Sequence, residues 1–462
     1  MIDNKTINGS PAKSFFVHML TRDIDLDDAV LDLIDNSLDG LLRVTGGDVS
    51  RYHEYGVNIS IKEDEFIIED NCGGIPTEVA KKYAFRMGRP GELSGGEKLP
   101  TVGLYGIGMK RSVFKMGKDI KITTKNDKDT FCVKIDKKWL ENDDAWDLAM
   151  SEAEEKIEGR GTRIVVKDIN PGVSTLFSSS SFASSLLKKI SVYYAFALKN
   201  GFKIALNDIE AKGKDIKFLF GKEDSLNMKP YFYQKEKDGL KITIICGLTG
   251  QPDEDDPTKD ISEEPQEDRM DAGWTIACNN RVVVYADKTM LTGWGDGLPK
   301  FHNQFNFIVG IVNFESDDPS KLPMTTTKKG VDTTSDLFFE VRQKMIEGAR
   351  YFKDYTNKWK NDRSADRKEV IEQSKYIDIE KAIPLMIKDP KRNGETYKPM
   401  SLPTPESKKK DDSKTTIKFE VDKKKIEEVA PSFTDSSKYD KNEIGLKCFE
   451  SVYKRIKRGL SV

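Results

Sequence analysis

The chain has 462 residues, and its 75 basic and 77 acidic side chains leave a formal net charge of only −2. Its length allows two or three domains with hydrophobic cores of their own, and the near balance of charge gives no overall indication of a nucleic-acid-binding protein. No apolar run approaches the ~18 residues needed to span a bilayer, and the N-terminal MIDNKTINGSPAK lacks the apolar core of a signal peptide, so a cytoplasmic protein without a membrane partner is expected.

The cysteines and histidines are scattered along the chain. The five cysteines contain no CxxC pattern, which is typical of reduced thiols in a cytosol. The three histidines, His18, His53 and His302, lie far apart in the sequence. Metal ligation by cysteine and a histidine-based catalytic cluster are therefore not expected.

After a short amphipathic helix expected within residues 11–24, a longer helix is predicted over residues 28–41 (DAVLDLIDNSLDGL). One face has the apolar spacing of a buried stripe: Leu31, Ile34, Leu38 and Leu41. A second face gathers polar side chains: Asp28, Asp32, Asn36 and Asp39. Like charges four residues apart destabilise a helix by about 0.2–0.5 kcal/mol. The second face is therefore either a solvated acidic surface or a site that holds a cation.

A strand that ends in a glycine turn follows at residues 67–76 (IIEDNCGGIP). Asp70, at the end of the strand, can accept a hydrogen bond from an amino group on a flat heterocycle. Gly73 and Gly74 would allow the backbone to approach the same ring closely. Taken alone, the segment is also consistent with an ordinary turn.

Residues 83–105 are rich in glycine and show little periodicity, which predicts either a mobile lid or a disordered loop. They lead into VGLYGIGMKRSVFKMG, in which Gly103, Gly106 and Gly108 precede a predicted helix. Backbone amides at a glycine-rich helix N-terminus form an anion site, and Lys110 adds a full charge. Many tight turns share this glycine spacing, so the pattern alone is weak evidence.

The order of these segments resembles that of the GHKL ATPases, which include gyrase B, MutL, the MORC proteins, histidine kinases and the ninety-kilodalton heat-shock chaperones. LDLIDNSLDG is similar to their ExxxN box, DNCGGI to the DxGxG box, GLYGIGMK to the phosphate-binding glycine box, and GRGT, before an alternating strand, to the Gly-Thr box. The four motifs stand in the family's order over roughly residues 10–210. The resemblance implies a Bergerat-type ATP-binding α/β sandwich, a mixed sheet covered by helices, over residues 1–215.

The resemblance also implies a ligand set for ATP and Mg²⁺. Asn36 would coordinate Mg²⁺, Asp70 would hold the adenine amino group, and Thr162 would support the adenine end through a water. Asp32 would be the general base for attack of water on the γ-phosphate. The other nucleotide contacts would come from Gly74 at the base and from Gly103, Gly106, Gly108 and Lys110 at the phosphates. Mg²⁺ prefers oxygen ligands and keeps several waters, so one carboxamide with phosphate oxygens is adequate.

Two positions depart from the family pattern. The family's general base is usually a glutamate four residues before the asparagine, and Asp32 is one methylene shorter. A well-placed general base contributes ~10²–10⁴ in rate, so slow turnover is expected. Asp35 lies about 100° around the helix from Asn36 and is a poorer base candidate. Cys72 replaces the first glycine of the DxGxG box, which implies that the backbone there does not need a positive φ.

A second, smaller α/β unit is predicted over residues 216–345, with an acidic insertion at about residues 250–272. A buried strand (FIVGIVNF), the polar loop PMTTTKKGVD and a helix follow one another near its end. This succession resembles the transducer domain that follows the ATPase domain in MutL, gyrase B, MORC and the chaperones, and a histidine kinase would not carry it. In those families the loop sends a lysine to the γ-phosphate. Lys328 is the preferred residue here and Lys329 the alternative.

The remainder of the chain divides into three predicted segments. Residues 346–390 are expected to be helical, residues 391–442 to form a disordered linker, and residues 443–462 to form a basic amphipathic helix. This last helix would dock on the body of the protein or on a partner, or contact nucleic acid.

The combined interpretation is an α+β protein that binds ATP and Mg²⁺, hydrolyses ATP slowly, closes its lid and forms an ATP-dependent homodimer in the manner of the MORC and MutL relatives. One alternative is an ATP-gated scaffold that barely hydrolyses the nucleotide. A chaperone rests on shared architecture alone, which does not transfer function. DNA and an unidentified protein remain candidate partners.

Overall fold

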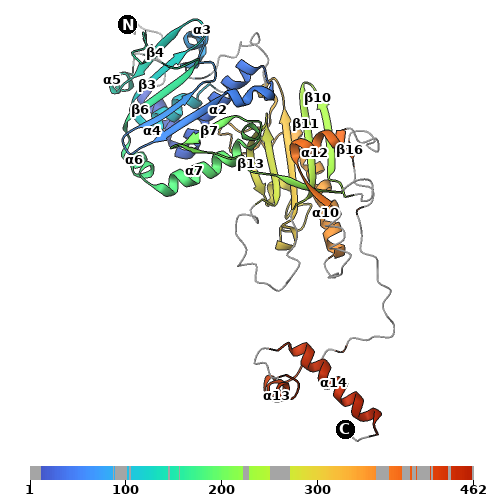
Figure 1. The fold of residues 1–462 in the computed structure, drawn as a ribbon. Coiled ribbons are helices and arrows are strands. Elements are labelled where there is room, and N and C mark those ends of the chain that lie inside the picture. The colour runs from blue at the N-terminus through green and yellow to red at the C-terminus, as the bar shows by residue number, and fades with distance from the viewer. Residues whose placement is uncertain are drawn as a thin grey trace, which may run out of the picture. The chain divides into compact units, whose positions relative to one another are not determined.

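The computed structural model of the chain divides into two compact units, Met1–Pro405 and Glu406–Val462. The first unit contains two large sheets (Figure 1). The residues described are 12–86, 88, 101–103, 106–143, 146–155, 157–221, 228–249, 271–359, 374–387, 396–397, 402, 417, 420–434 and 439–459. Most of the predicted lid and of the acidic insertion lies outside these residues.

The first sheet has eight strands in the order β5–β4–β3–β6–β2–β1–β7–β8 (Figure 1). Neighbours are antiparallel except β1 and β7, which are parallel, so the sheet is mixed. Apolar residues alternate along β1, which buries Val57, Ile59 and Ile61 on one face. The strands are β1 (Gly56–Ile61), β2 (Phe66–Asp70), β3 (Gly117–Lys125), β4 (Thr130–Ile135), β5 (Met150–Ser151), β6 (Gly161–Ile169), β7 (Lys203–Leu206) and β8 (Ile209–Glu210).

Helices cover this sheet, and the long helix α2 is the central one (Figure 1). Its apolar stripe shares one core with α4 and with the strands, and it ends where Gly46 takes a left-handed conformation. This arrangement confirms the expected mixed sheet covered by helices. The helices are α1 (Lys13–Arg22), α2 (Leu26–Thr45), α3 (Thr77–Val79), α4 (Gly108–Met116), α5 (Lys137–Glu141), α6 (Pro171–Phe177), α7 (Ser180–Tyr193) and α8 (Ala195–Lys199).

The second sheet has six strands in the order β13–β12–β14–β11–β10–β16. β12 and β14 run parallel, and the other neighbours are antiparallel. The sheet is buried on both faces, which explains the nearly continuous apolar runs in β11 and β12. The strands are β10 (Tyr231–Lys237), β11 (Leu240–Leu248), β12 (Gly273–Cys278), β13 (Arg281–Asp287), β14 (Ile308–Glu315) and β16 (Thr396–Tyr397).

Two layers cover the second sheet. The long helix α10 (Asp336–Trp359) packs on β11, β14 and β10. The other layer contains α12 (Ile379–Ile387) and a two-stranded ladder of β9 (Lys217–Gly221) and β15 (Ser374–Asp378). Helix α7 of the first part also contacts β13, so the two sheets are joined by packed side chains.

Residues 346–390 are predicted to be helical, but the structure has a strand, β15, within this range. Ile377 is buried beside Phe218 of β9 in the core under the second sheet. The partner strand lies more than a hundred residues earlier in the chain, so local periodicity could not reveal the pairing.

The C-terminal unit contains α13 (Lys423–Val429) and α14 (Lys441–Lys457), which contact each other. Ile444 of α14 and Ala430, directly after α13, are buried. The prediction of a disordered linker over residues 391–442 is therefore wrong for α13, which begins with a hydrogen bond from the Lys424 amide to the Asp422 carboxylate (2.9 Å). The apolar side chains along α14 are exposed: Leu446, Phe449, Val452, Tyr453 and Ile456.

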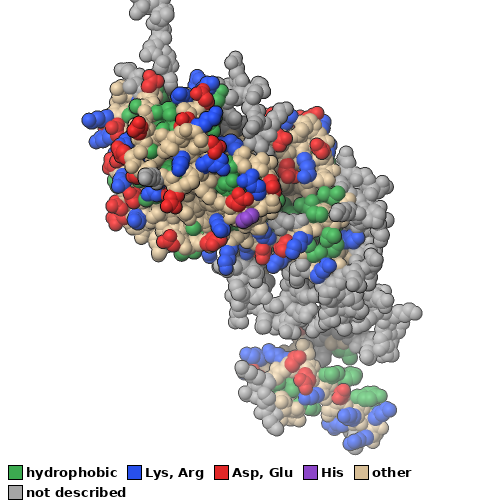
Figure 2. All heavy atoms as spheres, turned by 45° about the horizontal axis from the view of Figure 1, so that its top comes forward, with side chains coloured by type: hydrophobic (Ala, Val, Ile, Leu, Met, Phe, Trp, Pro, Cys, Tyr) green, Lys and Arg blue, Asp and Glu red, His purple; other side chains and the backbone are tan. Residues whose placement is uncertain are grey.

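Surface charge and cysteine state agree with the composition. Figure 2 shows basic and acidic side chains mixed over the visible face of the described parts. All five cysteines are free thiols. Among the described residues, no helix has the length and apolar character required to cross a bilayer.

Candidate functional site

Helix α2 forms the floor of the candidate site, and it opens to solvent at one position. Between Asp28 and Leu42, all of which the structure describes, Asn36 is the only exposed residue. Its neighbours Asp35 and Ser37 are buried. A polar side chain exposed in the middle of an otherwise enclosed helix marks a place where a ligand can reach the helix.

Asp70 lies at one end of the opening, on β2. The strand register places it directly opposite Thr162 of β6. Its carboxylate accepts hydrogen bonds from the Ser37 hydroxyl (2.9 Å), the Cys72 amide (2.8 Å) and the Thr162 amide (3.3 Å). Burial raises the pKa of Asp70 above its ordinary value, although these hydrogen bonds oppose the shift. Such an oriented acceptor suits an amino group on a heterocycle.

The glycine turn after Asp70 packs closely against β3. Gly74 has a φ of 69°, and a Cβ there would collide with the Lys125 carbonyl. Thr124 of β3 accepts a hydrogen bond from the Ile75 amide (2.8 Å), and its hydroxyl lies 3.2 Å from that of Thr162. Cys72 has no positive φ, as its replacement of a glycine implied.

The glycine-rich segment before α4 is attached to α2. The Asp39 carboxylate accepts hydrogen bonds from the amides of Val102 (2.7 Å) and Gly103 (2.9 Å). Gly106 has a φ of 68°. α4 begins at Gly108, where a Cβ would lie 3.5 Å from the carboxyl carbon of Asp32. The N-terminus of α4 and the candidate general base are therefore neighbours.

Lys110, in the first turn of α4, is buried and contacts the first residues of the predicted lid. Its ammonium donates a hydrogen bond to the Ala84 carbonyl (2.8 Å). Burial lowers the pKa of Lys110 to about 8. A lysine with so depressed a pKa gains from the arrival of an anion.

Asp32 is buried and engaged by two cations. One carboxylate oxygen accepts a hydrogen bond from Arg111 Nε of α4 (2.7 Å), and the other lies 3.2 Å from the Lys328 ammonium. Lys328 comes from the loop between β14 and α10, 296 positions further along the chain. The acidic face of α2 is thus neutralised by basic side chains. The sequence predicted either a solvated surface or a cation site at this face, and neither interpretation included such a pairing.

Asp35 completes this buried cluster. It is 0% exposed and accepts hydrogen bonds from the Tyr194 hydroxyl (2.7 Å), Arg281 Nε (3.3 Å) and the Lys328 ammonium (2.7 Å). Burial alone would raise the pKa of Asp35, but Arg281 and Lys328 outweigh it and hold that pKa below its ordinary value. The same pairing holds the pKa of Lys328 above its ordinary value despite burial.

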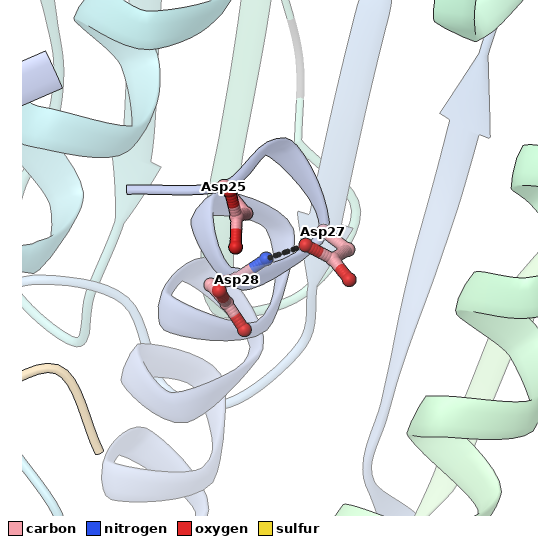
Figure 3. A group of neighbouring side chains, drawn as sticks. All are labelled: Asp25, Asp27 and Asp28. Carbon is pink, nitrogen blue, oxygen red and sulfur yellow. Dashed lines mark hydrogen bonds between the residues drawn. The ribbon is translucent and has the colours of Figure 1, made fainter. Parts of the chain in front are cut away.

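Three further carboxylates gather at the start of α2: Asp25, Asp27 and Asp28 (Figure 3). Lys329 forms ion pairs with Asp25 (2.6 Å) and with Asp28, and Lys189 pairs with Asp27. Because lysines neutralise all three carboxylates, this group is a salt-bridge cluster and not a metal site.

The family resemblance implies a Mg²⁺ ion, and Asn36 fits this role. Asn36 is the only exposed residue between Asp28 and Leu42, and its carboxamide has no hydrogen-bond partner among the described residues. Amide oxygens are suitable ligands for a hard cation that keeps several waters. The nearby carboxylates of Asp32 and Asp35 are already paired with cations, so Asn36 is the residue that would hold the ion.

The fold and the site together define a nucleotide-binding domain built on a mixed sheet. Residues 24–171 match the family model of the histidine kinase-, DNA gyrase B-, and HSP90-like ATPases. The chain therefore contains a GHKL-type ATPase domain, which confirms the resemblance stated from the four motifs and supports ATP binding. Comparison with curated proteins gave no match.

The structure brings most of the predicted residues together around α2. Asp70, Gly74 and Thr162 lie at one end of the site, and Asp32, Gly108 and Lys328 lie at the other. Sequence reasoning missed a second set of residues that orient them: Ser37, Asp39, Thr124, Tyr194 and Arg281. Of these, only Asp39 carried a signal, through its place on the polar face of α2.

Proposed function

We propose that this protein is a Mg²⁺-dependent ATPase of slow turnover, in which ATP binding closes a lid and drives dimerisation, as in the MORC and MutL relatives. The observation that carries the proposal is the ion pair between Lys328 and Asp32. It joins the loop after the second sheet to the helix that floors the nucleotide site. The part of the chain that contains the second sheet then acts as a transducer.

The nucleotide would lie across the opening of α2 at Asn36. Asp70 accepts a hydrogen bond from the adenine amino group, and Thr162 supports the adenine end of the nucleotide. The amides at the start of α4 and the ammonium of Lys110 bind the phosphates, because a helix N-terminus and a buried lysine both favour negative charge. Asn36 would hold Mg²⁺, which would supply positive charge beside the phosphates.

Hydrolysis requires a free oxygen on Asp32. In the structure Arg111 and Lys328 occupy both oxygens of this carboxylate. The γ-phosphate carries more negative charge than one carboxylate, so it competes for Lys328 and exposes Asp32 to the attacking water. Lys328 then stabilises the transferred phosphoryl group, where positioning and electrostatics supply most of the catalysis.

A second candidate function is an ATP-gated scaffold that binds ATP and hardly hydrolyses it. The same occupancy of Asp32 favours it, together with the shorter side chain of aspartate. Under this alternative the protein retains ATP for hours and assembles equally with ATP and with a non-hydrolysable analogue.

One experiment tests the proposal and separates the two functions. The mass in solution is measured without nucleotide, with ADP and with a non-hydrolysable ATP analogue, in parallel with multiple-turnover hydrolysis. Dimerisation with the analogue alone, with measurable turnover that Lys328→Met lowers strongly to a residual but still measurable rate, supports the ATPase. Dimerisation without turnover supports the scaffold, and the absence of nucleotide binding overturns both.

A further inference from the structure

We propose that Asp35 is the positioning residue through which the nucleotide site controls the transducer, acting on Lys328 directly and through Arg281. This inference rests on the proposed function, in which Lys328 binds the γ-phosphate. Asp35 would not touch the nucleotide. It would set the conformation of the residue that does.

Asp35 holds the side chain of Lys328 directly and its backbone through Arg281. Its carboxylate accepts a hydrogen bond from the Lys328 ammonium (2.7 Å) and another from Arg281 Nε (3.3 Å). Arg281 in turn donates a hydrogen bond from Nη1 to the Lys328 carbonyl (3.0 Å). The side chain and the backbone of Lys328 are therefore both tied to one buried carboxylate.

The backbone of Lys328 shows why it must be held. Its φ is 57°, in the left-handed region that non-glycine residues rarely adopt. The turn is closed by the Lys328 amide on the Thr325 carbonyl (2.9 Å) and by the Thr325 amide on the Gly330 carbonyl (3.1 Å). Such a strained residue persists only where its surroundings fix it, and strain of this kind clusters at switches. Asp35 and Arg281 supply that fixation.

Arg281 is placed by a tight hairpin. Asn279 and Asn280 have φ values of 49° and 63°, the two consecutive positive values of a type I′ turn between β12 and β13. The guanidinium also donates to the Val282 carbonyl (2.8 Å) and lies 4.9 Å from the centre of the Tyr193 ring. Arg281 is therefore fixed in one orientation beside Asp35.

The same hairpin reaches the glycine-rich segment. Asn279 Nδ2 donates hydrogen bonds to the Thr101 carbonyl (2.9 Å) and to the Ser316 carbonyl (3.0 Å). One turn of the second sheet thus contacts α2 through Arg281 and the start of the phosphate-binding segment through Asn279. A displacement of either part of the nucleotide site is passed to this turn.

Asp35 has one contact that can be broken, with Lys328, and two that persist, with Tyr194 and Arg281. When the γ-phosphate draws the Lys328 ammonium away, Tyr194 and Arg281 still satisfy the carboxylate. Asp35 then acts as the fixed pivot between α2 and β13, and the lysine loop moves around it. A buried carboxylate that kept no partner would be strongly destabilised.

The test is a double-mutant cycle on the full-length chain. Asp35→Asn keeps the shape of the side chain and removes its charge. We expect kcat to fall at least tenfold, with KM within about threefold of the wild type, because Asp35 acts on the lysine and not on the substrate. In a Lys328→Met background, Asp35→Asn should cause no further loss, because its effect passes through Lys328.

Two further measurements keep the outcome clear. Asp25→Asn removes the partner of the adjacent Lys329 and serves as the matched control, with kcat and KM expected within twofold of the wild type. If Asp35→Asn does not fold, Tyr194→Phe removes only one hydrogen bond to Asp35, and a fall of about threefold in kcat that disappears with Lys328→Met is expected. Analogue-induced dimerisation of each variant, read from its solution mass, gives a signal independent of turnover and is expected to weaken with Asp35→Asn.

Three results would overturn the inference. They are a kcat for Asp35→Asn equal to that of the control, losses that add in the double mutant, and dimerisation unchanged by Asp35→Asn. In each case the wild type still binds and hydrolyses ATP, so the proposed function stands. A wild type that binds no ATP overturns the proposed function instead.

Discussion

The carboxylate of Asp39 accepts a hydrogen bond from the backbone amide of Gly103 at 2.9 Å. It also accepts a hydrogen bond from the amide of Val102, so one side chain of α2 satisfies two consecutive donors of the glycine-rich segment. Burial raises the pKa of Asp39 above its ordinary value. The third carboxylate of the acidic face is therefore a loop anchor that links the floor of the site to the phosphate-binding segment.

Loss of this anchor should affect stability and nucleotide binding together. Asp39→Ala leaves the buried amide of Val102 without this acceptor, which costs about 1–3 kcal/mol, and also removes the hydrogen bond to the half-buried amide of Gly103. We expect a lower Tm in thermal unfolding and an ATP affinity weaker by roughly tenfold, because the segment loses its preorganisation. Asp39→Asn keeps one acceptor, and its Tm and ATP affinity should lie between those of the wild type and of Asp39→Ala. A wild-type Tm and affinity for Asp39→Ala would refute the role of the anchor.

Replacement of Asp32 separates binding from chemistry. Asp32→Asn should reduce the rate of ATP hydrolysis by roughly 10²-fold or more, because the amide accepts no proton from water. Its effect on the dissociation constant, measured by titration with a non-hydrolysable analogue, should stay within about threefold. Asp32→Glu supplies the family's longer base and is expected to raise turnover. Hydrolysis that is unaffected by Asp32→Asn would remove Asp32 from the mechanism.

The pKa of Lys110 makes ATP binding depend on pH. In the free protein its pKa lies at about 8, so above that pH the side chain is mostly neutral. A bound phosphate favours the ammonium, so binding must then take up a proton. Affinity should fall by up to about tenfold per pH unit above pH 8.

Calorimetry in buffers of different ionisation enthalpy, at about pH 7 and about pH 9, detects this proton uptake. Lys110→Arg keeps its charge at both pH values and should show neither the uptake nor the loss of affinity. An affinity of the wild type that does not change between these pH values would exclude Lys110 from the phosphate site.

Asp70 should determine the choice of nucleobase. Its carboxylate suits the amino group of adenine and repels the carbonyl oxygen that guanine carries at the same ring position. Hydrogen bonds to charged groups are worth about 1.5–3 kcal/mol. Asp70→Asn should therefore weaken ATP binding by about 10- to 100-fold and reduce the preference for ATP over GTP. Ser37→Ala removes one of the donors that orient Asp70 and should have a smaller effect of the same sign. Equal preference for ATP in Asp70→Asn and wild type would contradict this assignment.

The sequence was informative where motif and local geometry coincide. The DxGxG box predicted the strand end at Asp70, and Gly74 after it has the positive φ that glycine allows. The register between β2 and β6 then placed Thr162 opposite Asp70. The boxes thus predicted the fold of the first sheet, and the ligand roles of their residues stay predictions.

Residues brought together from distant parts of the chain could not be predicted. Lys328 and Lys329 are indistinguishable in the sequence, yet the left-handed φ of Lys328 directs it to Asp32 and Asp35, whereas Lys329 pairs with Asp25 and Asp28. From the sequence alone, Asp35 is only a poor candidate for the general base. Its partners Tyr194 and Arg281 lie more than 150 positions away, and no periodicity within α2 reports them.

The buried cluster of Asp35, Arg281 and Lys328 also limits how this protein can evolve. A neutral residue at position 35 alone would leave the buried Arg281 without its ion pair and Lys328 with Asp32 as its remaining counter-ion, and loss of either cation would leave a poorly compensated carboxylate. Substitutions at these three positions should therefore be selected jointly. In a set of homologous sequences we expect residues 35, 281 and 328 to covary, and lineages that have lost the acidic residue at 35 to have lost the basic residues as well.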